Sequence, residues 1–367
     1  MATEQTTVNR RAASAKAVCA CQQASKLLPS YCLSFGFGPF CLVSASLLST
    51  FCLAISLPPV KATPNGKPLV STSSKQKPES FYVLHFPAKG KIGRVGEAEI
   101  GADYSDKHTP TKKFAEANGA VRLTKGTGIC FIATDFMGLE KPVDIICTLP
   151  AEAVTSISLS NNIFEENEVV KLLRFTNLKR LELTGTEVTD ETMAKLAPLQ
   201  QLVTLVVDRT RVKGQFLASL SGKKNIRNLH LGHNELNKKI LDDLKKFPNL
   251  ERLSLPSAHL RDTDMAAIAA CPKLKYIDIS DNNDLTNTGI AQLKTLKNLE
   301  QIKMPFTAAN AKGLLALKGI ALVRVRMEPK QATGKDVISL KKTFPKLEID
   351  FENMKKELFN DYQEAFE

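Results

Sequence analysis

The stretch LKRLELTGTEVTDETMAKLAPLQQL, residues 178–202, combines two different spacings of apolar side chains. Leu181 and Leu183 are separated by one residue, as on a strand that places every second side chain on one face. A spacing of three, as on one face of a helix, follows at Met193, Leu196 and Leu199. A strand, a turn and a helix therefore share about 24 residues, and one such unit cannot bury its apolar side alone.

The same spacing recurs along the chain with a period of 24 residues. Steps of 24 in both directions from Leu178 arrive at apolar residues, namely Val154, Leu202, Ile226, Leu250 and Leu274. The third and fifth positions after each start are apolar as well, as in Leu253 and Leu255. We therefore expect a stack of similar units, each burying the apolar side of its neighbours.

The period changes towards the C-terminus. One additional residue near Asn283 moves the next start to Leu299, and beyond Leu317 the alternation has no unique register. The strand triplet is then expected to resume at Phe344, Leu347 and Ile349.

The eighth position after each start is small or polar and stands where the strand must leave the sheet. These residues are Asn162, Thr186, Thr210, Asn234, Ala258, Asn282 and Thr307. Asn and Thr side chains bond the backbone groups that a turn leaves unpaired, so the repeat with Ala258 should have a weaker turn. Three further residues precede the helical triplets and suit the N-cap position: Asp190, Asp262 and Asn287.

The pattern L-x-x-L-x-L-x-x-N/T-x-V over residues 154–351 resembles that of the leucine-rich repeat. The V-T-D sequence at 188–190 is most similar to the ribonuclease-inhibitor-like and cysteine-containing subclasses. Paired strands lie about 4.8 Å apart, whereas packed helices need about 8–10 Å, so such a stack must curve. The predicted fold class is α/β, a curved leucine-rich-repeat solenoid with parallel strands on the concave side and helices on the convex side.

The N-terminal segment has the composition of an export signal. Residues 1–26 contain four basic residues against Glu4 alone, and residues 27–60 contain no charged residue. The sequence VKA ending at Ala62 offers small residues for cleavage, which predicts a signal peptide over 1–62. The alternative is a retained membrane anchor, because residues 27–60 exceed the roughly 20 residues that span a bilayer.

Residues 63–80 are rich in Pro, Ser, Thr and Lys, which predicts a flexible linker. Residues 81–153 are predicted to form a small α+β cap over the first repeat. Its expected elements are strands in FYVLHF, AVRL and GICFIA and a short helix in TPTKKFAEANG, at 109–119. The order from FPAKGKIG to LPAEAVTSISLS resembles the N-terminal part of secreted or surface bacterial leucine-rich-repeat proteins of undefined function.

The last 16 residues, 352–367, are predicted to form an amphipathic helix that covers the final repeat. Its apolar side chains, together with the residue before it, follow helical spacing: Phe351, Met354, Leu358, Tyr362 and Phe366.

The chain carries a formal net charge of +12, and much of the excess falls on predicted helices, as at Lys245 and Lys246. Basic runs interleaved with aromatic residues, which single-stranded nucleic acid requires, are missing, so we interpret these lysines as a solvated convex face and expect no nucleic-acid partner. Cys271 is expected in the core. Cys130 and Cys147 either form a disulfide in an oxidising compartment or stay as buried thiols.

The sequence contains no catalytic motif in its predicted mature part, and we expect neither an enzyme nor a cofactor or metal. An exported, monomeric recognition protein that binds a protein or glycan on its concave face is the leading hypothesis. Two alternatives remain: an intracellular adaptor similar to the substrate-binding halves of ubiquitin-ligase receptors, and a metal or acid/base cluster around His230 with His233 and Asp278.

The predicted binding surface consists of side chains that lie between the buried leucines, at the second, fourth, sixth and seventh positions of the repeats. They are Arg180, Glu182, Asp208, Arg209, His230, His233, Arg252, Tyr276, Asp278 and Asp281, with Lys303 and Phe306 at the far edge. Arg and Tyr are enriched where binding energy concentrates. Arg252 and Tyr276 share the second position on adjacent strands, where they either form one binding anchor or stack on each other as a solvated pair.

Overall fold

The computed structural model describes residues 81–88, 92–98, 103, 111, 113–134, 136, 139 and 141–352. The expected signal peptide or anchor, the linker and the C-terminal helix after Glu352 lie outside the described residues. Within the described ranges, no helix has both the length and the apolar character needed to cross a bilayer.

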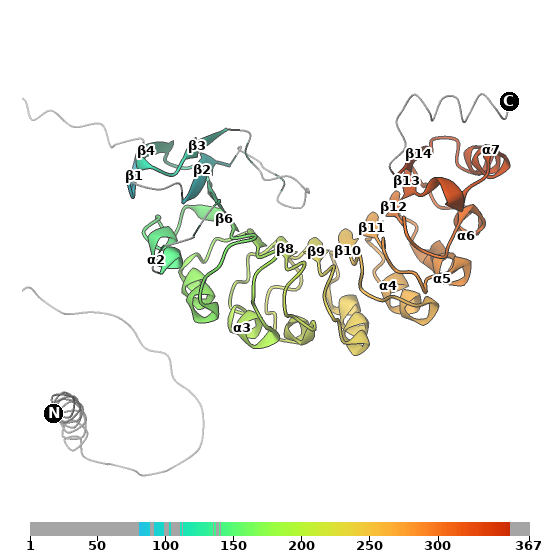
Figure 1. Ribbon diagram of the computed structural model, residues 1–367, viewed down its shortest axis with the longest axis horizontal. Helices are drawn as coiled ribbons and strands as arrows, with labels where there is room; N and C mark the ends of the chain where they lie inside the picture. The colour runs from blue at the N-terminus through green and yellow to red at the C-terminus, as the bar shows by residue number, and fades with distance from the viewer. Residues whose placement is uncertain are drawn as a thin grey trace, which may run out of the picture. The chain divides into compact units, whose positions relative to one another are not determined.

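The repeats form a continuous parallel sheet in which every strand pairs with the next one along the chain. Its strands are β6 (Val154–Ser158), β7 (Arg180–Glu182), β8 (Thr204–Val206), β9 (Asn228–His230), β10 (Arg252–Ser254), β11 (Tyr276–Asp278), β12 (Gln301–Lys303), β13 (Arg324–Met327) and β14 (Glu348–Phe351). They follow the inner side of a curved solenoid (Figure 1). The expected parallel sheet and its curvature are confirmed.

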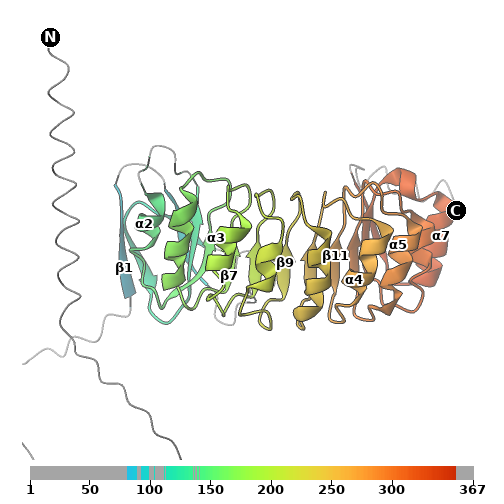
Figure 2. The ribbon, with the colours of Figure 1, turned by 90° about the horizontal axis from the view of Figure 1, so that it is seen from below.

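Short helices line the outer side of the curve and stand next to one another along the solenoid (Figure 2). They are η1 (Glu166–Arg174), α3 (Asp190–Lys195), η2 (Gln215–Ala218), η3 (Lys238–Lys246), η4 (Asp262–Asp264), α4 (Met265–Ala269), α5 (Asn287–Gln292), η5 (Leu293–Thr295), α6 (Ala311–Leu315), η6 (Pro329–Gln331) and α7 (Gly334–Thr343). Lys245 and Lys246 of η3 are exposed, as expected for a solvated convex face.

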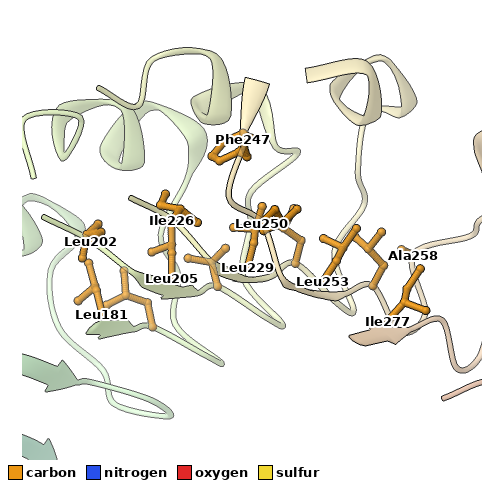
Figure 3. Packing of buried hydrophobic residues seen from close by; sticks show 14 of the residues in the cluster. Leu181, Leu202, Leu205, Ile226, Leu229, Phe247, Leu250, Leu253, Ala258 and Ile277 are labelled. Carbon is orange, nitrogen blue, oxygen red and sulfur yellow. The ribbon is translucent and has the colours of Figure 1, made fainter. Parts of the chain in front are cut away.

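The core lies between the sheet and the helices and runs without interruption through the repeats. Leu181, Leu205, Leu229 and Leu253 occupy equivalent positions on neighbouring strands and are completely buried. Figure 3 shows that each leucine packs beside its equivalent in the next repeat. The strand leucines of the sequence pattern are therefore the residues that hold successive repeats together.

The strand register confirms one expected irregularity and corrects another. Ile277 pairs with Ile302, so the extra residue near Asn283 is accommodated before β12. Ile349, however, pairs with Val325 and is thus the third position of the last repeat, not the fifth. The predicted triplet of Phe344, Leu347 and Ile349 was wrong by two residues. All three are buried, so hydrophobicity alone did not distinguish the registers.

Buried asparagines bond the turns that follow the strands. The amide nitrogen of Asn282 donates to the carbonyl oxygens of Leu255, Ile279 and Ser280, at 2.8–3.0 Å. Its amide oxygen accepts from the backbone N–H groups of Ala258 (3.1 Å) and Leu260 (2.8 Å) in the preceding repeat. The turn at Ala258 is therefore bonded by its neighbour's asparagine.

The expected N-cap residues bond a different helix from the one predicted. Asp190, Asp262 and Asn287 are each the first residue of their own helix rather than its cap. The Asp190 carboxylate accepts from the backbone N–H groups of Lys213 (2.6 Å) and Phe216 (2.9 Å) in the next repeat. Similar links from one repeat to the next join Glu166 to Thr189, Asp262 to Thr286 and Asn287 to Asn310.

The segment before the repeats extends the same sheet. β5 (Ile129–Ala133) pairs in parallel with β6, and β2 (Gly93–Glu97) and β3 (Phe114–Glu116) continue from β5 in antiparallel order. β1 (Phe81–Phe86) and β4 (Gly119–Thr124) form a separate two-stranded sheet. Val203 of the third repeat packs against Ala98 and the Cys130 side chain.

The helix expected at 109–119 was wrong, because Phe114–Glu116 forms strand β3 instead. A helix of this length is marginal by itself, whereas pairing with β2 satisfies the backbone. Among the described residues of this part of the chain, the helix is α2 (Pro142–Ile146), which has proline in its first turn.

The three described cysteines are free thiols. Cys130 is fully buried on β5, and Cys271 is 2% exposed within the core, as expected. Cys147 is half-buried, and its Sγ donates to the carbonyl oxygen of Lys171 at 3.8 Å. Cys130 and Cys147 are therefore unpaired thiols, and the expected burial holds for Cys130 but only in part for Cys147.

Candidate functional site

Two rows of side chains cross the concave face of the sheet, because they alternate with the buried leucines of each strand. The first row contains Ser156, Arg180, Thr204, Asn228, Arg252, Tyr276, Gln301, Arg324 and Glu348. The second row contains Ser158, Glu182, Val206, His230, Ser254, Asp278, Lys303, Arg326 and Asp350. Neighbours in a row are about 4.8 Å apart along the sheet.

Arg252 and Tyr276 are register partners on adjacent strands, as the sequence predicts, and their side chains stack on each other. The guanidinium carbon of Arg252 lies 4.0 Å from the centre of the Tyr276 ring, within the range of a cation–π contact. Burial, followed by the Asp278 carboxylate, raises the pKa of Tyr276, which therefore stays protonated at neutral pH. The stack holds two adaptable side chains in one arrangement on adjacent strands.

Asp278 is only 5% exposed and is the centre of a bonded cluster. Its Oδ1 accepts from the hydroxyl of Ser280 at 2.5 Å, and its Oδ2 accepts from Nζ of Lys303 at 3.1 Å. Ser280 and Lys303 satisfy the Asp278 carboxylate within the protein. Asp278 therefore shapes the concave face and balances its charge rather than offering a free anionic group.

Arg180 and Glu182 also pair with each other. The Nε atom of Arg180 donates to Oε1 of Glu182 at 2.7 Å, and Arg180 is only 3% exposed. The structure therefore brings the first two predicted residues together but leaves little of the arginine at the surface.

Four predicted residues lie in the turns at the ends of the strands. Arg209, His233, Asp281 and Phe306 are all exposed, and their φ angles lie between 54° and 57°. This left-handed conformation is uncommon for residues other than glycine, and the equivalent position in the second repeat is Gly185, with φ 69°. These side chains form a rim beside the two rows rather than part of them.

His230 faces Asp208, with 3.6 Å between its Nδ1 and the carboxylate Oδ2. The other carboxylate oxygen of Asp208 accepts from the backbone N–H of Gly232 at 2.6 Å. Asp278 lies on β11 and is separated from His230 by the whole of β10. The structure thus does not join His230 and Asp278 into the acid/base cluster of the alternative hypothesis. Within the described residues, no three His, Cys, Asp or Glu side chains are arranged to hold a metal ion.

Asn228 is a concave residue that sequence reasoning missed. It occupies the second position of its repeat between Thr204 and Arg252, and it is completely buried. Its second position in the repeat could have identified it as a concave residue. The prediction omitted it because an uncharged amide is less conspicuous than the charged side chains around it. Arg326, close to Asp350 (2.9 Å) and Glu352 (3.1 Å), extends the charged face beyond the predicted edge.

The comparison with protein-family models agrees with the repeat architecture. Residues 270–293, which include β11, match the family model described as "Leucine Rich repeat". No curated protein sequence matches the chain. A solved structure, human 5T4 (Wnt-activated inhibitory factor 1, Trophoblast glycoprotein), is 20% identical in sequence, with a TM-score of 0.44. That match covers 59% of this chain and 84% of 5T4.

Proposed function

We propose that this leucine-rich-repeat protein is a recognition scaffold that binds a protein partner on its concave face. The observation that carries the proposal is the Arg252–Tyr276 stack near the middle of the first row. Its side chains lie outside the leucine core, so folding does not require their chemistry. Arg and Tyr concentrate binding energy because each combines a large contact area with directional hydrogen bonds.

The surrounding residues support a preorganised surface. Asp278 and Lys303 are held by each other, and Arg180 is held by Glu182. Side chains that are already fixed lose less conformational entropy when a partner binds. A continuous row of side chains across adjacent parallel strands also suits an extended contact with a protein partner better than it suits a small molecule, which favours a deep pocket.

Capture of partners from a cell-envelope extract with the full-length chain tests this proposal. We expect Arg252→Ala and Tyr276→Ala to lose the captured partner without a change in thermal unfolding midpoint. Lys245→Ala/Lys246→Ala, on the exposed part of η3, is the matched control and should retain the partner. Mass spectrometry and carbohydrate analysis of the eluate distinguish a protein from a glycan. Loss with the lysine variant and retention in both concave variants would place binding on the convex side.

We further propose that the protein is exported as a monomer. The support is the basic segment 1–26, the uncharged segment 27–60 and the VKA sequence before Thr63. Expression in a secreting bacterial host should yield a mature chain that begins at Thr63, as measured by intact mass. Recovery of the complete chain in the membrane fraction would support an anchor, and recovery in the cytosol would support the intracellular adaptor.

A further inference from the structure

Asn228 is a concave side chain whose hydrogen bonding is incomplete. It is 0% exposed, and neither its amide nitrogen Nδ2 nor its amide oxygen Oδ1 has a hydrogen-bond partner. Buried polar atoms in folded proteins are nearly always paired, so two unpaired atoms on one amide require an explanation. The buried asparagines of the turns behave differently, since Asn234 and Asn282 are bonded through both amide atoms.

Arg252 lies next to Asn228 on the adjacent strand and is also incompletely paired. The Cα atoms of the two residues are register partners, and the Nε atom of Arg252 is buried without a hydrogen bond. The other lysine and arginine side chains on β7–β13 each have a carboxylate within 4.0 Å, in the pairs Arg180–Glu182, Lys303–Asp278, Arg324–Glu348 and Arg326–Asp350. Among the described residues, Arg252 has no such ion pair.

Tyr276 determines which part of the Arg252 guanidinium remains available. Its ring lies against the guanidinium, 4.0 Å from the guanidinium carbon to the ring centre. The N–H groups along the edge of a stacked guanidinium point away from the ring. Nε and a terminal nitrogen on that edge form a planar fork whose geometry matches the two oxygens of a carboxylate.

We infer that Asn228, Arg252 and Tyr276 form a binding site for the carboxylate of an acidic side chain on a protein partner. This inference rests on the proposed function and deepens it. Arg252 donates to the carboxylate oxygens, and Asn228 Nδ2 supplies a further donor from the next strand. Asn228 Oδ1 accepts a backbone N–H of the same partner segment. Entry of the carboxylate involves rotamer changes of neighbouring side chains, which are common at interfaces.

The charge distribution explains why the partner supplies the anion. Each other strand cation of β7–β13 is neutralised within the face, so a carboxylate arriving there would compete with an existing partner. At Arg252 it would complete an ion pair and fill unpaired hydrogen-bonding positions. A carboxylate of the partner is therefore expected to bind at Arg252 in preference to the other cations of the face.

The test is titration of the full-length chain with an N-acetylated, C-amidated hexaglutamate peptide at physiological salt, with hexaglutamine as the uncharged control. We expect binding of hexaglutamate only, and a loss of affinity of about 10-fold or more in Arg252→Lys, because lysine keeps the charge but not the fork or the stack. Asn228→Leu should lose a similar amount and keep or raise the unfolding midpoint, because it removes two unpaired buried atoms.

Asn228→Asp provides a second variant if Asn228→Leu does not fold. Its carboxylate would lie beside Arg252 and occupy the site from within, so hexaglutamate binding should disappear while the fold is retained. Lys245→Gln and Lys246→Gln, both on the exposed part of η3, each remove one positive charge elsewhere and should leave the affinity nearly unchanged.

Wild-type affinity in Arg252→Lys or in Asn228→Asp would overturn the inference, as would an equal loss in the Lys245→Gln and Lys246→Gln controls. Loss of the captured partner in Arg252→Ala, combined with unchanged hexaglutamate binding, would overturn the carboxylate site and leave the proposed function standing. The opposite pair of results would retain the carboxylate site and reject the concave face as the partner's docking surface.

Discussion

Asn282 bonds two successive repeats through one side chain that is 1% exposed. It accepts from Ala258 and Leu260 and donates to three carbonyl oxygens, whereas Asn162 donates to the carbonyl oxygen of Ser160. The two residues occupy the same position of the repeat pattern. The number of backbone groups that each side chain satisfies should therefore set its contribution to stability.

We expect Asn282→Ala to lower the free energy of unfolding by about 3 kcal/mol, because it leaves several buried backbone groups unpaired. Asn162→Ala is the matched control and should cost about 1 kcal/mol. Urea denaturation followed by circular dichroism measures both values. Equal costs for the two variants would contradict the role of Asn282 in the turn at Ala258.

The described cysteines should differ in their reactivity. Burial raises the pKa of Cys130 to about 12 and that of Cys271 to about 11, and it also raises the pKa of the half-buried Cys147. Since the thiolate is the reactive form and access is also needed, iodoacetamide should modify Cys147 first in the native protein. Peptide mapping by mass spectrometry measures the order, and modification in urea is the control. A peptide pair linked through Cys130 and Cys147 would contradict the free thiols.

Among the helices, α7 has a capping box that is local to the helix. The Asp336 carboxylate accepts from the backbone N–H (2.8 Å) and the hydroxyl (2.7 Å) of Thr333. These bonds, led by the backbone N–H, lower the pKa of Asp336 below its ordinary value of 3.8. Several other helices also receive a bond from a side chain of the preceding repeat, as η2 does from Asp190.

The pKa shift of Asp336 predicts the pH dependence of its contribution. A carboxyl group with a lowered folded-state pKa stabilises the protein fully above the unfolded value of 3.8, and the effect is lost as pH falls through the lower folded value. Asp336→Asn should therefore cost about 1 kcal/mol at neutral pH and progressively less in acid.

Ser339→Ala, in the same helix, is the control and should have a pH-independent effect, because its hydroxyl donates to the Lys335 carbonyl oxygen. Urea denaturation at neutral and acidic pH provides the comparison. A cost for Asp336→Asn that stays constant down to pH values below 3.8 would argue against the capping carboxylate.

At the scale of the whole molecule, one core joins the N-terminal cap and the repeats. Phe131 on β5 and Leu229 on β9 are both 0% exposed and belong to the same contiguous apolar cluster. Because β5 is hydrogen-bonded to β6, the cap continues the sheet and covers its N-terminal side. Units stabilised mainly through their neighbours are expected to unfold together when the interfaces are strong.

We therefore expect Phe131→Ala and Leu229→Ala to lower the midpoint of the same single unfolding transition. Each substitution should reduce the free energy of unfolding by about 3–4 kcal/mol. Circular dichroism gives the transition, and hydrogen exchange shows whether the cap and the repeats open together. The conservative Leu229→Met is the control and should cost less than about 1.5 kcal/mol. Two separate transitions in Phe131→Ala would show that the cap unfolds independently.

The spacing of apolar side chains predicted the repeat, the parallel strands, the extra residue near Asn283 and the concave positions that alternate with the buried leucines. These features depend on the local periods of side-chain burial, which every repeat expresses again. The adjacent positions of Arg252 and Tyr276 follow from the same period. The burial pattern left the last register open because Phe344, Leu347 and Ile349 are all buried.

Features that depend on a neighbouring element could be seen only in the folded protein. Pairing with β2 made Phe114–Glu116 a strand, and hydrogen-bond geometry across repeats assigned Asp190 to the helix that follows its own. The other Lys and Arg side chains of the strands lie within reach of carboxylates. Arg252 has no such partner and lies beside the unpaired amide of Asn228. Such pairings depend on distances between side chains far apart in the sequence, and a periodic pattern contains no information about those distances.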